Sequence, residues 1–291
     1  MHDSTLLPSR AARPGYPVQR RRIERVTVIV LAAATVMLLS ALAAVVWHVL
    51  SRGVPVVTLD FLIQQPTMSG RSGGIFSTIV STFWVTGLAL VISVPVGVGA
   101  AVYLTQYAVE GGFVRVIRIG TSSLAAVPSI VYGLFGFLFF VVYLRMGWSV
   151  MSGGLTLALM TLPAILKTSE EAIKAVPREY LEGSLALGAP KWKAVFSVVI
   201  PAAMPGIMSG ILLSIGRSFG ETAAVILTAG SAIHMPESLW DPARTMAVHL
   251  YILSSEGLSP SRAYGTAAVL VGCVLVLNVA ASMLTRRSRL H

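Results

Sequence analysis

The most informative pattern along the chain is a series of six long apolar runs separated by shorter polar segments. The runs cover about residues 26–50, 75–104, 119–144, 150–166, 203–230 and 263–285. A helix needs about 20 predominantly apolar residues to cross a bilayer, with a lower limit near 17. Because the runs are continuous rather than alternating, they predict spanning helices and not barrel strands. The expected fold class is an all-α integral membrane protein with six transmembrane helices.

The basic residues predict the orientation of these helices. Of the 22 Lys and Arg residues, sixteen lie in 1–25, 105–118, 167–193 and the C-terminal tail, and five lie in the segments of the opposite side. Since Lys and Arg accumulate on the cytoplasmic side, both termini are predicted to be cytoplasmic, as an even number of spans requires. The domains expected are a disordered basic tail, 1–25, whose arginines touch anionic lipid heads or only anchor the topology, and a six-helix domain, 26–291.

Composition supports a membrane protein and narrows the chemistry. Hydrophobic residues make up 55% of the chain and charged residues only 12%, against about 25% charged in soluble domains. The net charge of +10 is concentrated at the ends of the apolar runs, which argues against nucleic-acid binding. Cys273 is the single cysteine, and His48, His234 and His249 are scattered, so neither an intrachain disulfide nor a metal site is expected.

The fifth run contains two opposite charges, Arg217 and Glu221, four residues apart. In one helix this spacing places both on one face, together with Ser214, Ser218 and Thr228. Arg217 is about 14 residues from each end of the run, hence about 20 Å from either surface at about 1.5 Å per residue. An ionisable residue at that depth costs a few kcal/mol and usually marks a substrate or ion route.

Two hypotheses for this pair remain open from the residues alone. In the first, Arg217 contacts an anion in transit and Glu221 keeps the anion from binding too tightly. In the second, Arg217 and Glu221 form a structural ion pair, or a gate with a companion subunit. Lys167, at the end of the fourth run, either receives the anion on exit or anchors the cytoplasmic end of the helix.

The predicted cytoplasmic segment 167–201 is too long and too charged for a plain connector. Thr168 or Ser169 is expected to begin a first helix there. A second short helix is expected at about 178–187, because Pro177 suits the start of a helix and Gly188 suits its end. Its apolar side faces the membrane domain and its charged side faces a partner protein. The outer segment 231–262 is expected to hold a short interfacial helix or a loop that covers a gate.

The same segment resembles a known motif. Permease subunits of ATP-binding cassette (ABC) importers carry a loop written E-A-A, three residues, G, nine residues, I-x-L-P. The matching positions here begin with Glu182, Gly183 and Ser184, continue with Gly188 and end at Pro201, all at the same spacing. The resemblance implies a coupling helix that docks on a separate ATPase through Arg178, Glu179, Glu182, Gly183, Ser184, Gly188 and Pro201.

A second resemblance concerns the cargo. The runs 73–108, 127–140 and 155–225 resemble the A-type permease of bacterial phosphate-specific transporters, and GRSFGET at 216–222 is similar to the family pattern G-R-x-x-G-E-T. This implies an ABC importer permease fold in the bacterial plasma (inner) membrane, with inorganic phosphate as cargo. It also implies a homologous second permease, two ATPase subunits and an extracytoplasmic phosphate-binding protein. Sulfate or molybdate as cargo, or an ATP-independent carrier or channel, are the alternatives.

The chain has no G-x-x-x-x-G-K-[ST] segment, the pattern whose backbone amides cradle nucleotide phosphates. ATP and Mg²⁺ are therefore expected on the partner ATPase, and this chain is expected to be a transport subunit, not an enzyme, with no cofactor of its own.

Overall fold

The computed structural model describes residues 18–287, and residues 1–17 and 288–291 lie outside the described range. The chain divides into two units, Met1–His48 and Val49–His291. The first described helix is α1 (Val18–Gly53), and its stretch from 26 to 48 is exposed at every position and carries no charged residue. Residues 18–25 are helical, and most of the tail predicted to be disordered falls outside the described residues.

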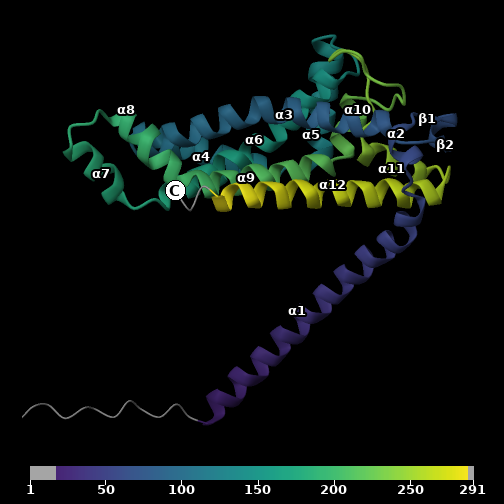
Figure 1. Ribbon diagram of the computed structural model, residues 1–291. Helices are drawn as coiled ribbons and strands as arrows, with labels where there is room; N and C mark the ends of the chain where they lie inside the picture. Colours follow the sequence, from purple (N-terminus) through teal and green to yellow (C-terminus); the bar gives the residue numbers. More distant parts are fainter. Residues whose placement is uncertain (1–17, 288–291) are drawn as a thin grey trace, which may run out of the picture. The chain divides into compact units, whose positions relative to one another are not determined.

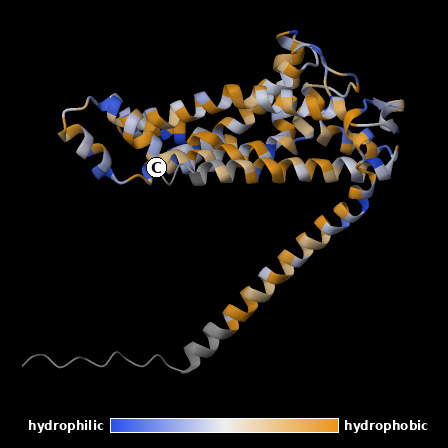
Figure 2. Ribbon diagram, viewed as in Figure 1, coloured by the Kyte–Doolittle hydropathy of each residue, from blue (hydrophilic) through white to orange (hydrophobic). Residues whose placement is uncertain are grey.

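Four long helices of the second unit run side by side in Figure 1. They are α3 (Phe76–Val102), α6 (Val150–Lys174), α9 (Ile200–Phe219) and α12 (Pro260–Arg287). α3 packs mainly on α6, α6 also packs on α9, and α12 packs on α9. Figure 2 shows that apolar residues dominate all four. The predicted runs 75–104 and 263–285 are confirmed as helices.

Shorter elements complete the two ends of the bundle and the connections within it. They are η1 (Val54–Val56), α2 (Leu59–Ile63), β1 (Pro66–Thr67), η2 (Met68–Gly70), β2 (Ser72–Gly73), η3 (Tyr103–Tyr107), α4 (Gly112–Ala125), α5 (Ser129–Gly136), η4 (Phe137–Tyr143), α7 (Arg178–Ala186), α8 (Lys191–Ala194), η5 (Val195–Val199), α10 (Ala223–Thr228) and α11 (Met246–Ser255). The η3, η4 and η5 segments are π-helical. Figure 1 places α7 and α8 at one end of the bundle and the β1–β2 hairpin and α11 at the other.

The third run, 119–144, is not one straight helix. α4 ends at Ala125, α5 begins at Ser129, and the two axes differ by 100°. Pro128 explains the break, because it has no N–H to donate and it disfavours helical geometry in the preceding residue. The hydroxyl of Tyr132 donates to the carbonyl of Leu124 at 2.9 Å and so ties α5 back to the end of α4.

The fourth run was predicted to end near residue 166, but α6 continues to Lys174. The prediction that Thr168 or Ser169 begins a new helix is wrong, since the Thr168 hydroxyl donates within α6 to the carbonyl of Ala164 at 2.9 Å. The extension contains the buried Glu170, whose charge is met by two cations described below. Because its charge is compensated in this way, the polar sequence continues as helix.

The fifth run, 203–230, is also interrupted. α9 ends at Phe219, Gly220 follows as its C-terminal cap, and α10 begins only at Ala223. Glu221 therefore lies in a non-helical link, and the prediction that Arg217 and Glu221 share one continuous helix face is wrong. Thr222, with φ −113° and ψ −51°, completes the link.

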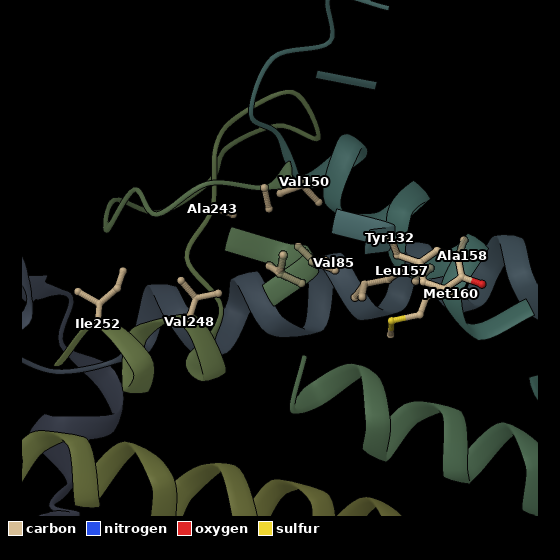
Figure 3. Close-up of a cluster of buried hydrophobic side chains, with 13 residues drawn as sticks. Val85, Tyr132, Val150, Leu157, Ala158, Met160, Ala243, Val248 and Ile252 are labelled. Carbon is tan, nitrogen blue, oxygen red and sulfur yellow. The ribbon is translucent and has the colours of Figure 1, made fainter. Parts of the chain in front are cut away.

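Three buried apolar clusters hold the second unit together. The largest joins α3, α5, α6, α10 and α11, and Figure 3 shows Val85, Leu157, Met160 and Val248 among its members. A second joins the end of α3 to α6, η5 and α9, and a third seats α4 on α6 through Val114 and Leu166. The second and third clusters hold in place the start of α4 and the end of α6, the two segments that carry Arg118 and Glu170.

The fifth run contains two pairs of glycines, each with a spacing of four residues, which can allow another helix to pack closely. The first pair does so, because a side-chain carbon added at Gly206 would lie 2.6 Å from Ala172 Cβ, and one at Gly210 would overlap Thr168. The second pair does not, since a carbon at Gly216 or Gly220 would meet its nearest atom at 3.8 Å. Close approach of α9 to α6 therefore depends on Gly206 and Gly210.

The outer segment 231–262 forms the short helix α11, one of the two outcomes predicted for it. His249 of α11 is fully buried, and the added carbon at Gly70 (φ +98°) would lie 2.6 Å from its ring. Arg244, also buried, donates to the carbonyls of Ser231 and Ser69. These contacts attach the β1–β2 region to the outer segment.

Candidate translocation and coupling sites

Arg217 lies in the last turn of α9, and its side chain is exposed on the surface of the single chain. Among the described residues, no carboxylate pairs with it. Its charge acts electrostatically on the hydroxyl of Tyr132, which places it near the bend between α4 and α5. An exposed arginine in a spanning segment has to face another subunit or water, because lipid offers it no compensation.

The carboxylate of Glu221 is directed to the start of the next helix, α10, rather than to Arg217. Its carboxylate accepts a hydrogen bond at 3.3 Å from the backbone N–H of Ala224, in the first turn of α10. In the described part of the chain, no ion pair joins it to Arg217. The geometry therefore gives Glu221 a helix-capping contact and leaves the positive charge of Arg217 without a carboxylate partner among residues 18–287.

The three hydroxyl residues grouped with this pair face the bundle interior. Ser214 and Thr228 are buried, and each donates to a backbone carbonyl of its own helix, Gly210 at 3.0 Å and Ala224 at 2.7 Å. Ser218 is buried as well, and its hydroxyl has no hydrogen-bond partner among the described residues. Of the three, Ser218 alone retains an unused hydroxyl next to Arg217.

Lys167 lies on α6, exposed, and lines a cavity of about 200 Å³ between α4 and α6. The same cavity is bordered by an ion-pair network that the sequence reasoning missed. Glu170 accepts from Arg118 at 2.8 Å and from Lys174 at 2.6 Å, and Arg118 also donates to Glu110 at 2.9 Å. The available signal was the position of these four charges at predicted membrane boundaries, but only the fold brings Arg118 and Glu170, 52 residues apart, together.

The short helix predicted at about 178–187 is confirmed as α7 (Arg178–Ala186). Pro177 precedes its first residue with φ −56° and ψ 135°, and Gly188 ends the turn after it with φ +82°, a conformation that favours glycine. On one side, the half-buried Leu181 packs against the cluster formed by α3, α6, η5 and α9. Arg178, Glu179 and Glu182 are exposed, as the motif reading requires of partner-facing residues.

The remaining motif positions lie around α7. Gly183 is exposed and Ser184 half-buried, both within the helix, and Pro201 is exposed in the first turn of α9, just after the π-helical η5. Exposed apolar side chains accompany them: Tyr180 is 54%, Leu187 91% and Trp192 62% exposed. Large apolar groups exposed at this end of the bundle are typical of a surface that binds another protein.

The described residues contain no group of three or more His, Cys, Asp or Glu side chains that could hold a metal ion. Cys273 is a half-buried free thiol in α12.

Five described helices are long and apolar enough to cross a membrane, and the bent pair α4 and α5–η4 makes a sixth if it is one span. With the short, largely exposed helix α7 between two of these spans, the molecule belongs to the class of multi-pass membrane permeases. The sequence pattern of the family described as "Binding-protein-dependent transport system inner membrane component" matches residues 93–289, and the chain belongs to this family.

Relatives and solved structures agree with this membership. The chain is 35% identical over 283 residues to the phosphate transport system permease protein PstA 1 of Mycobacterium tuberculosis, covering 93% of this chain and 92% of that protein. It is 33% identical over 253 residues to the probable ABC transporter permease protein YqgI of Bacillus subtilis, covering 81% and 86%. A chain of a bacterial alginate ABC transporter, crystallised with its alginate pentasaccharide-bound periplasmic protein, superposes with a TM-score of 0.63 at 13% identity, covering 93% and 96%. The ABC importer permease fold is thereby confirmed.

Proposed function

We propose that this chain is one permease subunit of an ATP-driven importer of inorganic phosphate in a bacterial plasma membrane. It forms half of the translocation route with a homologous second permease. Two ATPase subunits, which carry ATP and Mg²⁺, serve the pair of permeases, and one of them docks at α7 of this chain. An extracytoplasmic phosphate-binding protein delivers the anion at the opposite end. The similarity to a phosphate transport permease over 93% of the chain supports the choice of cargo.

The observation that carries the proposal is the charge of Arg217, which has no carboxylate partner among the described residues. Arg217 lies at the end of α9, just before the non-helical link to α10. Arginine presents a planar, permanently charged fork that matches the oxygens of phosphate. Because Glu221 caps α10 instead of pairing with Arg217, the guanidinium is available to an anion in the route or to a second subunit. This geometry favours the hypothesis of anion contact over an ion pair within the chain.

The position of α7 supports a separate motor. Its charged face is exposed, its apolar face is anchored through Leu181, and it follows α6 after only a short turn. A partner that moves α7 therefore pulls directly on the end of a spanning helix. An ATP-independent carrier or channel would leave this protrusion without a role.

The test is labelled-phosphate uptake by vesicles that contain the purified complex, with and without ATP. Uptake that depends on ATP and on the ATPase subunits is expected, whereas uptake by this chain without them would refute the proposal. If sulfate or molybdate at equal concentration competes with phosphate for uptake, the transported anion is another oxyanion.

Arg217→Gln is expected to abolish uptake while the complex still assembles, and Arg217→Lys, which keeps the charge but not the fork, to retain part of it. Co-purification of the ATPase subunits controls for assembly. Normal uptake by Arg217→Gln would remove this residue from the mechanism.

A further inference from the structure

The helix α4 presents three different faces. Val114 and Ile117 pack into the cluster on α6, and Val116 is an exposed apolar residue on the opposite side. Between these faces lies a polar stripe, at spacings of three and four residues, which we call the polar face of α4. It consists of Arg115, Arg118 and Ser122. The stripe begins in the predicted cytoplasmic segment 105–118 and continues at Ser122 into the apolar run 119–144, where lipid offers a hydroxyl no partner.

Two hollows border the polar face. A groove of about 870 Å³ is lined by Arg115, Arg118 and Ser122, together with Glu110 and the backbone at the start of α4. The smaller cavity of about 200 Å³, toward α6, is lined by Arg118, Ser122 and Lys167. Since Arg118 and Ser122 border both hollows, a small ion that leaves one meets the same side chains in the other.

Some of the charged side chains along these hollows form ion pairs and others do not. The carboxylate of Glu170 is occupied by Arg118 and Lys174, and Glu110 is occupied by Arg118. Arg115 and Lys167 have no ion-pair or hydrogen-bond partner among the residues that the structure describes. The two hollows thus hold two cations that are free to receive an anion, beside one arginine that is held in place by carboxylates.

The far end of α4 leads to Arg217. The Leu124 carbonyl, in the last turn of α4, accepts the hydrogen bond from Tyr132, and the charge of Arg217 acts on that same hydroxyl. From this point the polar face runs back along α4 toward the end of the bundle that carries α7. The chain therefore offers cations at both ends of α4 and hydroxyl and guanidinium groups between them.

We propose that the polar face of α4 lines the cytoplasmic half of the route of the transported oxyanion, with Arg115 in one hollow and Lys167 in the other as the last cations that it meets before release. The inference rests on the proposed function and extends it to residues outside the motifs. Arg118, already held by Glu110 and Glu170, is a positioning residue: it supplies a fixed positive field without gripping the ion. Two cations in open hollows bind an oxyanion weakly enough to let it leave, because water reaches them.

Thiol accessibility tests whether the polar face is in contact with water, independently of transport. In a Cys273→Ala background, Ser122→Cys is placed on the polar face, and Leu124→Cys, at an exposed apolar position outside the polar face of the same helix, is the matched control. A membrane-impermeant methanethiosulfonate is added from the cytoplasmic side to the complete complex in vesicles. Because thiolate formation needs water, Ser122→Cys is expected to react about tenfold faster or more.

Anions then test occupancy of the site. Inorganic phosphate is expected to slow labelling of Ser122→Cys, whereas chloride at equal ionic strength is not. Protection by sulfate or molybdate but not by phosphate would uphold the route and refute phosphate as the cargo. Labelling of Ser122→Cys no faster than Leu124→Cys, with or without ATP, would overturn the route and leave the uptake test of the proposed function unaffected.

The cations themselves are tested in the uptake assay. The double variant Arg115→Gln with Lys167→Gln is expected to lose about tenfold or more of the uptake rate, while ATP hydrolysis stimulated by the binding protein persists. Restoring charge in Arg115→Lys with Lys167→Arg is expected to recover most of the rate. Unchanged uptake in the Gln variants, with the complex assembled, contradicts the proposed exit site.

Discussion

Replacing Glu170 by Gln separates the contribution of one buried charge from that of the surrounding helix packing. The side chain of Glu170 is only 9% exposed, and its carboxylate receives hydrogen bonds from Arg118 at 2.8 Å and Lys174 at 2.6 Å. Gln keeps the shape and one acceptor oxygen but removes the negative charge. Arg118 and Lys174 are then left side by side without the charge that holds them together.

The expected cost lies between two limits. Breaking a fully buried ion pair by removing one partner costs about 3–5 kcal/mol, whereas an exposed pair contributes about 1 kcal/mol or less. Here the carboxylate is buried, but Arg118 and Lys174 are 30% and 51% exposed, so water can solvate both cations after the change. We expect the free energy of unfolding to fall by about 1–3 kcal/mol. For a chain of this size, each kcal/mol lowers the Tm by about 2–4 °C.

The assay is thermal unfolding of the detergent-solubilised protein, with Glu171→Gln as the matched control. Glu171 is the next residue of α6, exposed, and without an ion-pair partner in the described structure. Its replacement is expected to change stability by no more than about 0.5 kcal/mol. A double-mutant cycle with Arg118→Gln is expected to give a coupling energy of about 1 kcal/mol or more. Equal effects of Glu170→Gln and Glu171→Gln, or additivity with Arg118→Gln, would refute the account of α6.

Three further changes test other parts of the structure. Burial lowers the pKa of His249 from 6.5 to about 4, so the unfolded chain binds the proton first as the pH falls. The stability is therefore complete above about pH 6.5 and falls by about 2 kcal/mol at pH 5. His249→Gln should remove this difference between the Tm at pH 7 and the Tm at pH 5, and an unchanged difference contradicts the assignment. Gly210→Ala is expected to destabilise the protein by about 1–3 kcal/mol, because the added carbon overpacks against α6. Gly216→Ala, where the nearest atom lies at 3.8 Å, should change the stability by no more than about 1 kcal/mol in the same melting assay. Equal losses would contradict the packing argument. Glu182→Lys should uncouple ATP hydrolysis from uptake without lowering Tm, because its side chain is exposed; intact coupling would argue against docking at α7.

The elements that depend on nearby residues, such as those that start or end a helix, were predictable from the sequence. α3 and α12 follow from long apolar runs, and α7 follows from Pro177 and Gly188, whose backbone preferences act within a few residues. Pro128 carried a signal for the bend between α4 and α5, because a proline restricts the residue before it, but its place inside an apolar run concealed that signal.

The features decided by tertiary contacts were not predictable. α6 continues through Glu170 only because Arg118 and Lys174 meet its charge, and Arg118 comes from a helix 52 residues earlier. The end of α9 at Phe219 places Glu221 outside the helix, although its spacing from Arg217 suits an unbroken one. The residues of the candidate site were therefore recognised, but the pairing of their charges was not.

The ion-pair network around Arg118 has a sheltered bond and an open one. Glu110, 81% exposed, holds the guanidinium from the water side, and Glu170 holds it from within the protein. Dissolved ions weaken the first attraction over a Debye length of about 8–10 Å at physiological ionic strength and scarcely reach the second. A rise in salt therefore releases Glu110 first, while the sheltered bond to Glu170 still fastens α4 to α6.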